Sequence, residues 1–410
     1  MAITEFLRTN VRWLSAGVLL NFSTSFGQTF FISIFAGQIM LDYGLSNGDW
    51  GRIYGTGTLV SGLLMIWAGA YTDLYRARSL SVAMFCMMCA FCLAMAFNTN
   101  AALLIVVIFG LRFSGQGMLS HIAMVAMARW FVGGRGKAAA ISRLGFSFGE
   151  ALLPVLFVAL MAYTSWRSLW AVSAVLALLF ILPLRYLLSE ERTPQSVAEE
   201  SHAVGMSGRH WSRSQVLRHP LFWLVLPAIA APPMMGTAFF FQQVYFADIK
   251  GWEHVHLVAL FPFYTLTTVF SLLLAGAAID RWGSSVMMPL FQLPMAVAFV
   301  VFSQATSLSW AMVGLALLAL MQGAYGVVPL AFWSEYYGTR HIGSIKAMAA
   351  AVMVVASAIG PALTGALIDL GISLTVQMLW IAVYVVIACA LVYIGVLRAK
   401  PTLQHASVSA

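Results

Sequence analysis

Long apolar stretches run through almost the whole chain and constrain its fold more than any motif does. A helix needs about 20 mostly apolar residues to cross the hydrocarbon core of a bilayer. Twelve stretches of this kind can be delimited, at residues 13–37, 50–72, 80–97, 101–128, 137–162, 167–188, 220–247, 257–279, 284–303, 308–333, 344–369 and 373–397. Only 9% of the residues are charged, against about 25% in a soluble domain. We therefore expect an all-α membrane protein with twelve transmembrane helices.

A polar segment at residues 189–219 divides these stretches into two sets of six. It mixes acidic and basic residues with Ser, Gly and Pro, and it is too short to form a domain of its own. The pattern predicts two six-helix bundles, at residues 1–188 and 220–397. We expect residues 189–219 to be a cytoplasmic linker and residues 398–410 a cytoplasmic tail.

A short motif occurs once in each set. It consists of a glycine and an aspartate four residues apart, followed by basic residues, and is found at Gly69, Asp73 and Arg76 and again at Gly276, Asp280 and Arg281. Each glycine and aspartate is repeated after 207 residues, and so is a proline, at Pro154 and Pro361. These matches at one offset of about half the chain predict a duplicated protein with pseudo-symmetric halves.

The motif resembles the signature loop of the major facilitator superfamily, which joins the second and third spans and recurs weakly between the eighth and ninth. The first copy lacks the closing glycine of the family pattern, whereas the second copy ends in Gly283 and is closer to it. The resemblance implies a transporter rather than an enzyme, with no cofactor. We expect Asp73, Arg76, Asp280 and Arg281 to act at a cytoplasmic gate, because an acid at this turn can pair with basic groups or cap a neighbouring helix.

The distribution of basic residues predicts the orientation. With the N-terminus inside, 17 of the 22 lysines and arginines lie on the cytoplasmic side, in accordance with the positive-inside rule. We expect both termini in the cytoplasm and a bacterial cytoplasmic membrane as the location. The net charge of +8 does not indicate nucleic-acid binding, because the basic residues are scattered between apolar stretches. The four cysteines also lie within these stretches and do not suggest a metal site.

Three charged residues lie inside predicted spans. They are Arg112 in the fourth span and Arg143 and Glu150 in the fifth. An intramembrane charge costs at least about 2.5–3.5 kcal/mol and needs an interior site or a partner. Arg143 and Glu150 share a helical stripe with Ser147 and Pro154. Because a mid-membrane carboxyl group is stable when neutral or paired, Glu150 is a candidate for proton coupling.

The fourth span carries a second resemblance. The run from Leu111 to Gly117 resembles the superfamily motif in which an arginine is followed by spaced glycines. This implies a role for Arg112 in the cavity or in proton coupling; the alternative is a structural ion pair with Glu150. His121, nine residues after Arg112 on a regular helix, faces the other way and is expected to serve in packing or in an interhelical hydrogen bond. The basic segment 128–138 resembles the same loop in many superfamily members, including those close to the oxalate and monocarboxylate carriers; its expected main role is to set the topology beside anionic lipid.

Neutral polar residues complete the candidate substrate site. Spans one, four, seven and ten line the cavity in the superfamily, so the resemblance implies that several of these residues, with Arg112 and Arg143, face substrate: Asn21, Gln28, Gln116, Gln242, Gln243, Tyr264, Gln322 and Tyr325. In an ordinary bundle they would form interhelical hydrogen bonds worth about 0.6 kcal/mol each. Pro232, Pro233 and Gly236 in span seven and Gly360 and Pro361 in span eleven predict helix breaks.

These residues favour one function over its rivals. Two buried arginines against one glutamate leave a positive cavity, which favours symport of a proton with a small organic anion such as a monocarboxylate. One departure counts against it, since span eight lacks the basic residue of the monocarboxylate and oxalate carriers. The alternative is proton-driven efflux of lipophilic or cationic compounds. A non-transporting receptor would carry a larger soluble domain. We expect a monomer whose partners are the bilayer, the proton and the substrate.

Overall fold

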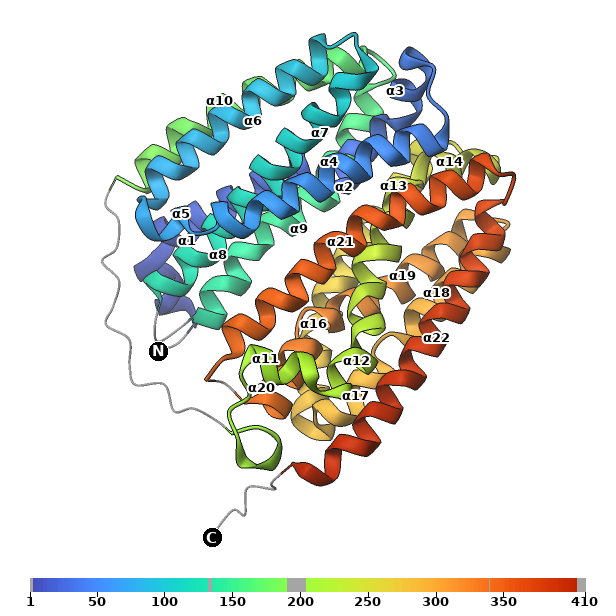
Figure 1. Cartoon of the computed structure of the whole chain (residues 1–410). Coiled ribbons are helices and arrows are strands. Elements are labelled where there is room, and N and C mark those ends of the chain that lie inside the picture. The colour runs from blue at the N-terminus through green and yellow to red at the C-terminus, as the bar shows by residue number, and fades with distance from the viewer. Residues whose placement is uncertain (1–2, 132–134, 190–203, 339, 404–410) are drawn as a thin grey trace.

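The computed structural model describes residues 3–131, 135–189, 204–338 and 340–403, in which every regular element is a helix (Figure 1). Among these residues, ten helices are long and apolar enough to cross a membrane, or eleven if the bent pair Leu7–Gly27 and Thr29–Tyr43 is one span. The all-α membrane fold is confirmed, but the count falls short of twelve. The stretch 50–72 does fold as a long helix, α4 (Asn47–Ala68), yet Arg52 and five glycines make it less apolar than the others.

The first half of the chain forms helices α1 to α10. Span one is interrupted, and span four contains a wider π-helical segment between two α-helices. The elements are α1 (Ile3–Ser23), a 3-10 turn (Thr24–Gly27), α2 (Thr29–Ile32), a 3-10 turn (Ser33–Phe35), α3 (Ala36–Tyr43), α4, α5 (Tyr71–Leu74), α6 (Ala77–Phe97), a 3-10 turn (Ala101–Leu103), α7 (Leu104–Leu111), the π-helical segment (Arg112–Leu119), α8 (Ser120–Trp130), α9 (Arg135–Leu160) and α10 (Trp166–Leu187).

The second half repeats this plan with more interruptions. Its elements are α11 (Arg213–Arg218), α12 (Pro220–Ala231), a π-helical segment (Pro232–Gly236), α13 (Thr237–Phe241), α14 (Gln243–Ile249), α15 (His254–Val258), α16 (Phe261–Trp282), α17 (Ser284–Leu290), α18 (Leu293–Gln304), α19 (Leu308–Tyr325), α20 (Val328–Tyr337), α21 (Ile342–Asp369) and α22 (Leu374–Ala399). The break expected at the two prolines of span seven is therefore present. The break predicted at Gly360 and Pro361 in span eleven is absent, since α21 runs without interruption from Ile342 to Asp369. Gly360 instead allows α21 to pack on span seven, where a Cβ on Gly360 would lie 2.1 Å from the Met234 carbonyl oxygen.

Helices pack mainly within their own half, and a few pairs join the halves. Figure 1 shows two groups of long helices side by side, with α4 and α21 lying along the boundary. The other contacts between halves join α9 to α15 and α16, and the broken end of span one to α13 and α14. α1 begins and α22 ends on the same side of the molecule (Figure 1). We call that side the inner end and the opposite one the outer end.

Residues 204–219 of the predicted linker pack against the second half, whereas residues 190–203 lie outside the described residues. Trp211 donates its backbone N–H to the Tyr337 carbonyl oxygen (3.1 Å) and its indole N–H to the Met206 carbonyl oxygen (3.1 Å). The Trp211 ring also lies edge-on to His219 and Tyr337, with centroids 4.9 and 5.7 Å away. Residues 204–219 are thus attached to α20 through the contacts of Trp211 with Tyr337.

Candidate functional site

Arg112 lies in the interior of the first half, where two irregular segments meet. Its side chain is 1% exposed, and its Nη1 donates to the Gly27 carbonyl oxygen (3.1 Å) and the Thr29 hydroxyl (3.3 Å). The guanidinium also sits over the Tyr54 ring, 5.4 Å from its centroid, a contact worth about 2 kcal/mol when desolvated. Its Nε has no hydrogen-bond partner among the described residues.

The break in span one creates this arrangement. A Cβ on Gly27 would lie 2.2 Å from the Leu111 carbonyl oxygen and 2.9 Å from the Cα of Gly115, so glycine permits the two backbones to touch. Gln28 follows in an extended conformation (φ −89°, ψ 152°) and interrupts the helix. The carbonyl of Gly27 is left without a helical partner and accepts the hydrogen bond from Arg112.

Glu150 does not pair with Arg112, so the alternative of a structural ion pair between them is not seen in the described residues. The Glu150 carboxylate is 9% exposed and accepts a hydrogen bond from the Thr265 hydroxyl on α16 (3.1 Å). The positive charge that acts on it is Arg143, two turns away along α9. Tyr264, which is 2% exposed, also lies close enough to interact electrostatically. Glu150 is thus a contact between the two halves.

Arg143 is the more accessible of the two intramembrane arginines. It is exposed and lies over the Phe146 ring, 5.3 Å from the centroid. The opposite side of α9 packs against α1, where a Cβ on Gly145 would lie 1.9 Å from the Val18 carbonyl oxygen. Since Arg143 shares its stripe with Glu150, it points toward the second half, nearer the inner end.

Spans one and seven are joined by a second polar contact. Gln243 is fully buried, and its amide donates to the Ser33 hydroxyl (2.7 Å) and the Phe30 carbonyl oxygen (3.3 Å). Ser33 in turn donates to the Phe240 carbonyl oxygen (2.7 Å). The Nε2 of His254 lies 3.3 Å from the side-chain oxygen of Gln243. Gln243 therefore holds the halves together near the outer end.

Other candidate residues likewise form hydrogen bonds between neighbouring helices. The Asn21 amide donates to the Ser142 hydroxyl (2.6 Å), which joins α1 to α9. Gln242 donates to Thr364 (3.3 Å), and the Tyr325 hydroxyl donates to the Ile229 carbonyl oxygen (3.2 Å). These side chains form the interhelical hydrogen bonds that were the alternative to a substrate role. His121 behaves in the same way, with its Nε2 3.4 Å from the Thr72 hydroxyl.

Three glutamines remain available. The side chains of Gln28, Gln116 and Gln322 are half-buried, and none makes a hydrogen bond within the described part of the chain. Gln28 and Gln116 flank the contact between Gly27 and Gly115, because Gly27 packs on the backbone nitrogen of Gln116. A half-buried amide without a partner can bind a polar ligand, since it would otherwise lose hydrogen bonds to water.

The expected gate residues are not brought together. Arg76 and Asp280 are exposed and have no partner among the described residues, and Arg281 lies over its neighbour Trp282. The side chain of Asp73 lies outside the described residues. Among the described residues, Arg76, Asp280 and Arg281 therefore do not form a charge network with one another at this end.

Sequence reasoning missed residues that join the halves at the outer end. Ser33, Ser46, His254 and Asp369 all take part in contacts between halves or beside them. Ser46 carried a signal, since a serine three residues before Asp49 is a helix-capping pattern. Nothing in the sequence indicates that Asp369 lies beside it, because the two are 323 positions apart.

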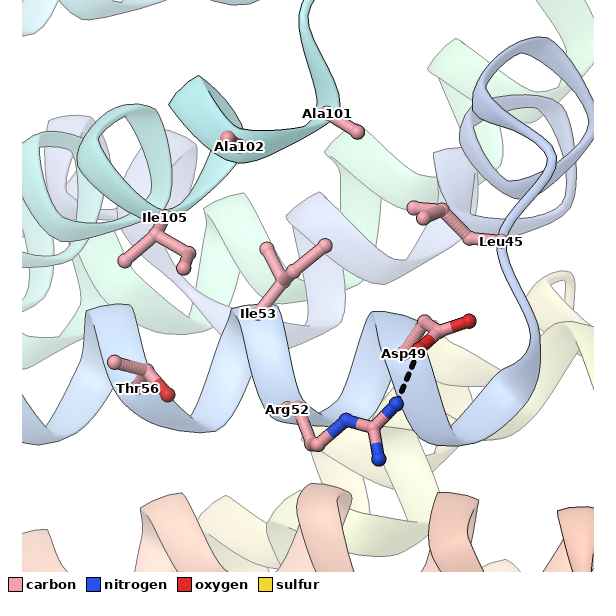
Figure 2. A pocket seen from close by; sticks show the side chains of 8 residues that line it. All are labelled: Leu45, Asp49, Arg52, Ile53, Thr56, Ala101, Ala102 and Ile105. Atoms are coloured by element: carbon pink, nitrogen blue, oxygen red, sulfur yellow. Dashed lines mark hydrogen bonds and ion pairs between the residues drawn. The ribbon is translucent and has the colours of Figure 1, made fainter.

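A surface pocket of about 280 Å³ lies beside the outer end of α4. Leu45, Ile53, Ala101, Ala102 and Ile105 form its apolar walls, and Asp49 and Arg52 meet at its edge (Figure 2). The candidate residues do not line it, so it is separate from the site described above.

Comparisons with known proteins agree with the fold. A bacterial homologue of the human lysosomal transporter Spinster, solved in an inward-facing, unoccupied conformation, superposes with a TM-score of 0.72 at 15% identity and covers 96% of this chain and 98% of its own. The occupied inward-facing form has a TM-score of 0.72 at 14% identity, with coverages of 98% and 99%. At these identities the likeness shows the fold alone.

Sequence comparison adds a relative and a family. An uncharacterised 38 kDa protein from the 23S RNA operon of Thermoproteus tenax is 26% identical over 266 residues, which span 64% of each chain. Residues 17–270 match the family described as the Major Facilitator Superfamily, which is more than half of the chain. This multi-pass membrane protein therefore belongs to the Major Facilitator Superfamily.

Proposed function

We propose that the protein is a secondary active transporter that moves a small, monocarboxylate-like organic anion together with a proton, by alternating access. The observation that supports the substrate class is Arg112, which is 1% exposed and has no acidic partner among the described residues. An unpaired buried charge costs several kcal/mol. A substrate carboxylate would supply the missing counter-charge.

We assign the first contacts of the anion to the accessible groups. Arg143 is exposed, and Gln28, Gln116 and Gln322 have free amides. Arg112 is enclosed by Tyr54 and Thr29, so its contact with substrate requires span one to move at Gly27. The absence of a basic residue from span eight fits a site that holds its anion from the first half.

We propose Glu150 as the coupling residue. It lies between the halves and bonds to Thr265, so its protonation changes a contact that must break when the halves move. Residues 1–188 and 220–397 would be the moving bodies, and Asp73, Arg76, Asp280 and Arg281 would assemble at the inner gate once that end closes. We place both termini in the cytoplasm of a bacterial cell, and the transporter in its cytoplasmic membrane as a monomer.

Ligand-dependent thermal stabilisation tests the substrate class. Purified protein is heated with a panel of monocarboxylates and of lipophilic cations, and we expect only carboxylates to stabilise it. Binding at 100 times the dissociation constant stabilises by about 2.7 kcal/mol. Arg112→Gln should abolish this stabilisation, and Arg112→Lys should weaken carboxylate affinity about tenfold or more, because lysine lacks the bidentate fork.

Arg52→Lys provides the matched control, since Arg52 is exposed and its partner is Asp49 rather than a residue assigned to the substrate. A well-folded Arg112→Lys protein with the affinity of the parent would reduce Arg112 to a structural role. Stabilisation by lipophilic cations alone would favour the rival function, proton-driven efflux.

A further inference from the structure

The closest contact between the halves runs along α4 and α21 and ends at a carboxylate. Asp369 is the last residue of α21, and its Oδ2 accepts hydrogen bonds from the Gly48 backbone N–H (2.9 Å) and the Ser46 hydroxyl (2.6 Å). Both donors belong to the N-terminus of α4, in the other half of the protein. A negative charge at a helix N-terminus is favourable, because the first N–H groups lack helical partners.

One of the two donors to Asp369, the Ser46 hydroxyl, also belongs to a helix cap inside the first half. The Ser46 hydroxyl also lies 2.9 Å from the Asp49 carboxylate and accepts the backbone N–H of Asp49 (3.0 Å). One hydroxyl proton cannot serve two carboxylates at once. Asp49 has a second partner in Arg52, as Figure 2 shows, whereas both donors to Asp369 come from across the boundary.

Glycines allow α4 and α21 to pack closely along the turns that precede Asp369. A Cβ on Gly365 would lie 2.3 Å from the Asn47 carbonyl oxygen, and a Cβ on Gly51 would lie 2.6 Å from that of Pro361. One turn further, a Cβ on Gly55 would lie 2.7 Å from the Ala358 carbonyl oxygen. The backbones therefore touch along this seam, and α4 cannot separate from α21 without first losing the bonds to Asp369 at its outer end.

We propose that Asp369 is an outer latch, which holds the transporter closed to the outside through Ser46 and the N-terminus of α4. The latch rests on the proposed alternating access, since an outward-open state must break these bonds in every cycle. It adds to that proposal a residue which sets how often the outer end opens. Loss of the latch raises the outward-open population without removing any group assigned to the substrate.

Distances between spin labels test the latch without any substrate. Labels are attached to cysteines introduced at Tyr163 and Ser307, which are exposed in outer loops of the two halves, after the four native cysteines are replaced. In Asp369→Asn, we expect the ratio of outward-open to outward-closed molecules to rise roughly three- to tenfold. A change of this size corresponds to about 0.7–1.4 kcal/mol, which is the net contribution of about one hydrogen bond.

Asp49→Asn is the matched control, because its partners Ser46 and Arg52 lie in the same half. We expect it not to raise the outward-open population, because it leaves both donors to Asp369 in place and removes a competitor for the Ser46 hydroxyl. Ser46→Ala removes one donor to Asp369 without altering α21. It should raise the ratio of outward-open to outward-closed molecules by less than Asp369→Asn does. If Asp369→Asn does not fold, Ser46→Ala provides the test of the latch. Parental distances in Asp369→Asn, or in Ser46→Ala where that variant decides, overturn the latch. Failure to bind any carboxylate would refute the proposed substrate and leave these distances interpretable.

Discussion

Single charged residues in this protein are stabilised in different ways. Arg112 rests on the Tyr54 ring and on a carbonyl oxygen freed by the break at Gln28. Glu150 has a hydroxyl partner on the opposite half and a cation two turns away on its own helix. Neither of the two groups is fully neutralised, and each is therefore able to respond when a ligand or a proton arrives.

A residue outside the spans should make stability depend on pH. His219 precedes α12, and its Nδ1 accepts the backbone N–H of Leu221 (3.3 Å). Burial lowers the pKa of His219 below its ordinary value of 6.5. The unfolded chain therefore takes up this proton at a higher pH than the folded chain does. This contribution to stability is fully present above pH 6.5 and is lost as the pH falls from there through the folded pKa.

The measurement is the thermal unfolding of detergent-solubilised protein at pH 7.5 and at pH 5.5. His219→Asn keeps a side-chain acceptor for the cap but does not titrate. We expect its melting temperature to fall less than that of the parent between the two pH values. His256→Asn is the control, because His256 is an exposed histidine on α15, beside Glu253. Equal losses in the parent and in His219→Asn would contradict the assignment.

At the scale of helices, glycines determine which pairs touch and which helices break. The seam of α4 and α21 and the contact of span one with span four both depend on backbones that approach without side chains between them. The same approach brings Gly360 onto the π-helical segment of span seven. Proline and glycine in span seven therefore shape a packed contact as well as a break.

Gly51→Ala tests the seam. The added Cβ would lie 2.6 Å from the Pro361 carbonyl oxygen, which is backbone and cannot move aside as a flexible side chain can. Overpacking of this kind costs about 1–3 kcal/mol, so we expect a lower melting temperature. Gly236→Ala is the matched control, since nothing lies within 4 Å of its added Cβ, and it should be neutral or slightly stabilising. A Gly51→Ala protein as stable as Gly236→Ala would show that the seam is looser than described.

The molecule as a whole consists of two halves that touch toward one end. Asp369, Gln243 and Glu150 each bond across the boundary, at the outer end or at mid-depth. Nearer the inner end, Arg143, Arg76 and Asp280 are exposed. This asymmetry is what alternating access would require of a state closed on the outside.

Glu150→Gln separates proton coupling from passive exchange. Glutamine imitates the protonated carboxyl group and keeps an oxygen that can accept from Thr265. In vesicles, we expect the variant to exchange substrate across the membrane but not to concentrate it when an inward proton gradient is imposed. Thr265→Val should impair both activities less, because it leaves the carboxyl group in place. Concentration of substrate by Glu150→Gln at the level of the parent would exclude Glu150 as the coupling residue.

The sequence by itself determined the membrane fold and the short set of intramembrane charges. Both follow from one physical constraint, since backbone polar groups in lipid must bond within a helix and charges there are costly. The sequence predicts twelve spans, whereas ten or eleven helices of the described residues are long and apolar enough to cross a membrane. The difference is α4, in which Arg52 and the glycines that pack against α21 lower the hydropathy. The gate aspartate Asp73 remains a prediction.

Only the tertiary structure decided which polar residues are free and which hold helices together. Asn21, Gln242 and Gln243 carry the same side-chain amide as Gln28, Gln116 and Gln322. Within the described part of the chain, the first three are hydrogen-bonded to neighbouring helices and the last three are not. The difference depends on how each helix is rotated and shifted against its neighbours. The 3-10 and π-helical segments of spans one, four and seven alter that rotation. For the same reason, Glu150 bonds to Thr265 rather than to Arg112, and Asp369 bonds to Gly48, which is 321 positions away in the sequence.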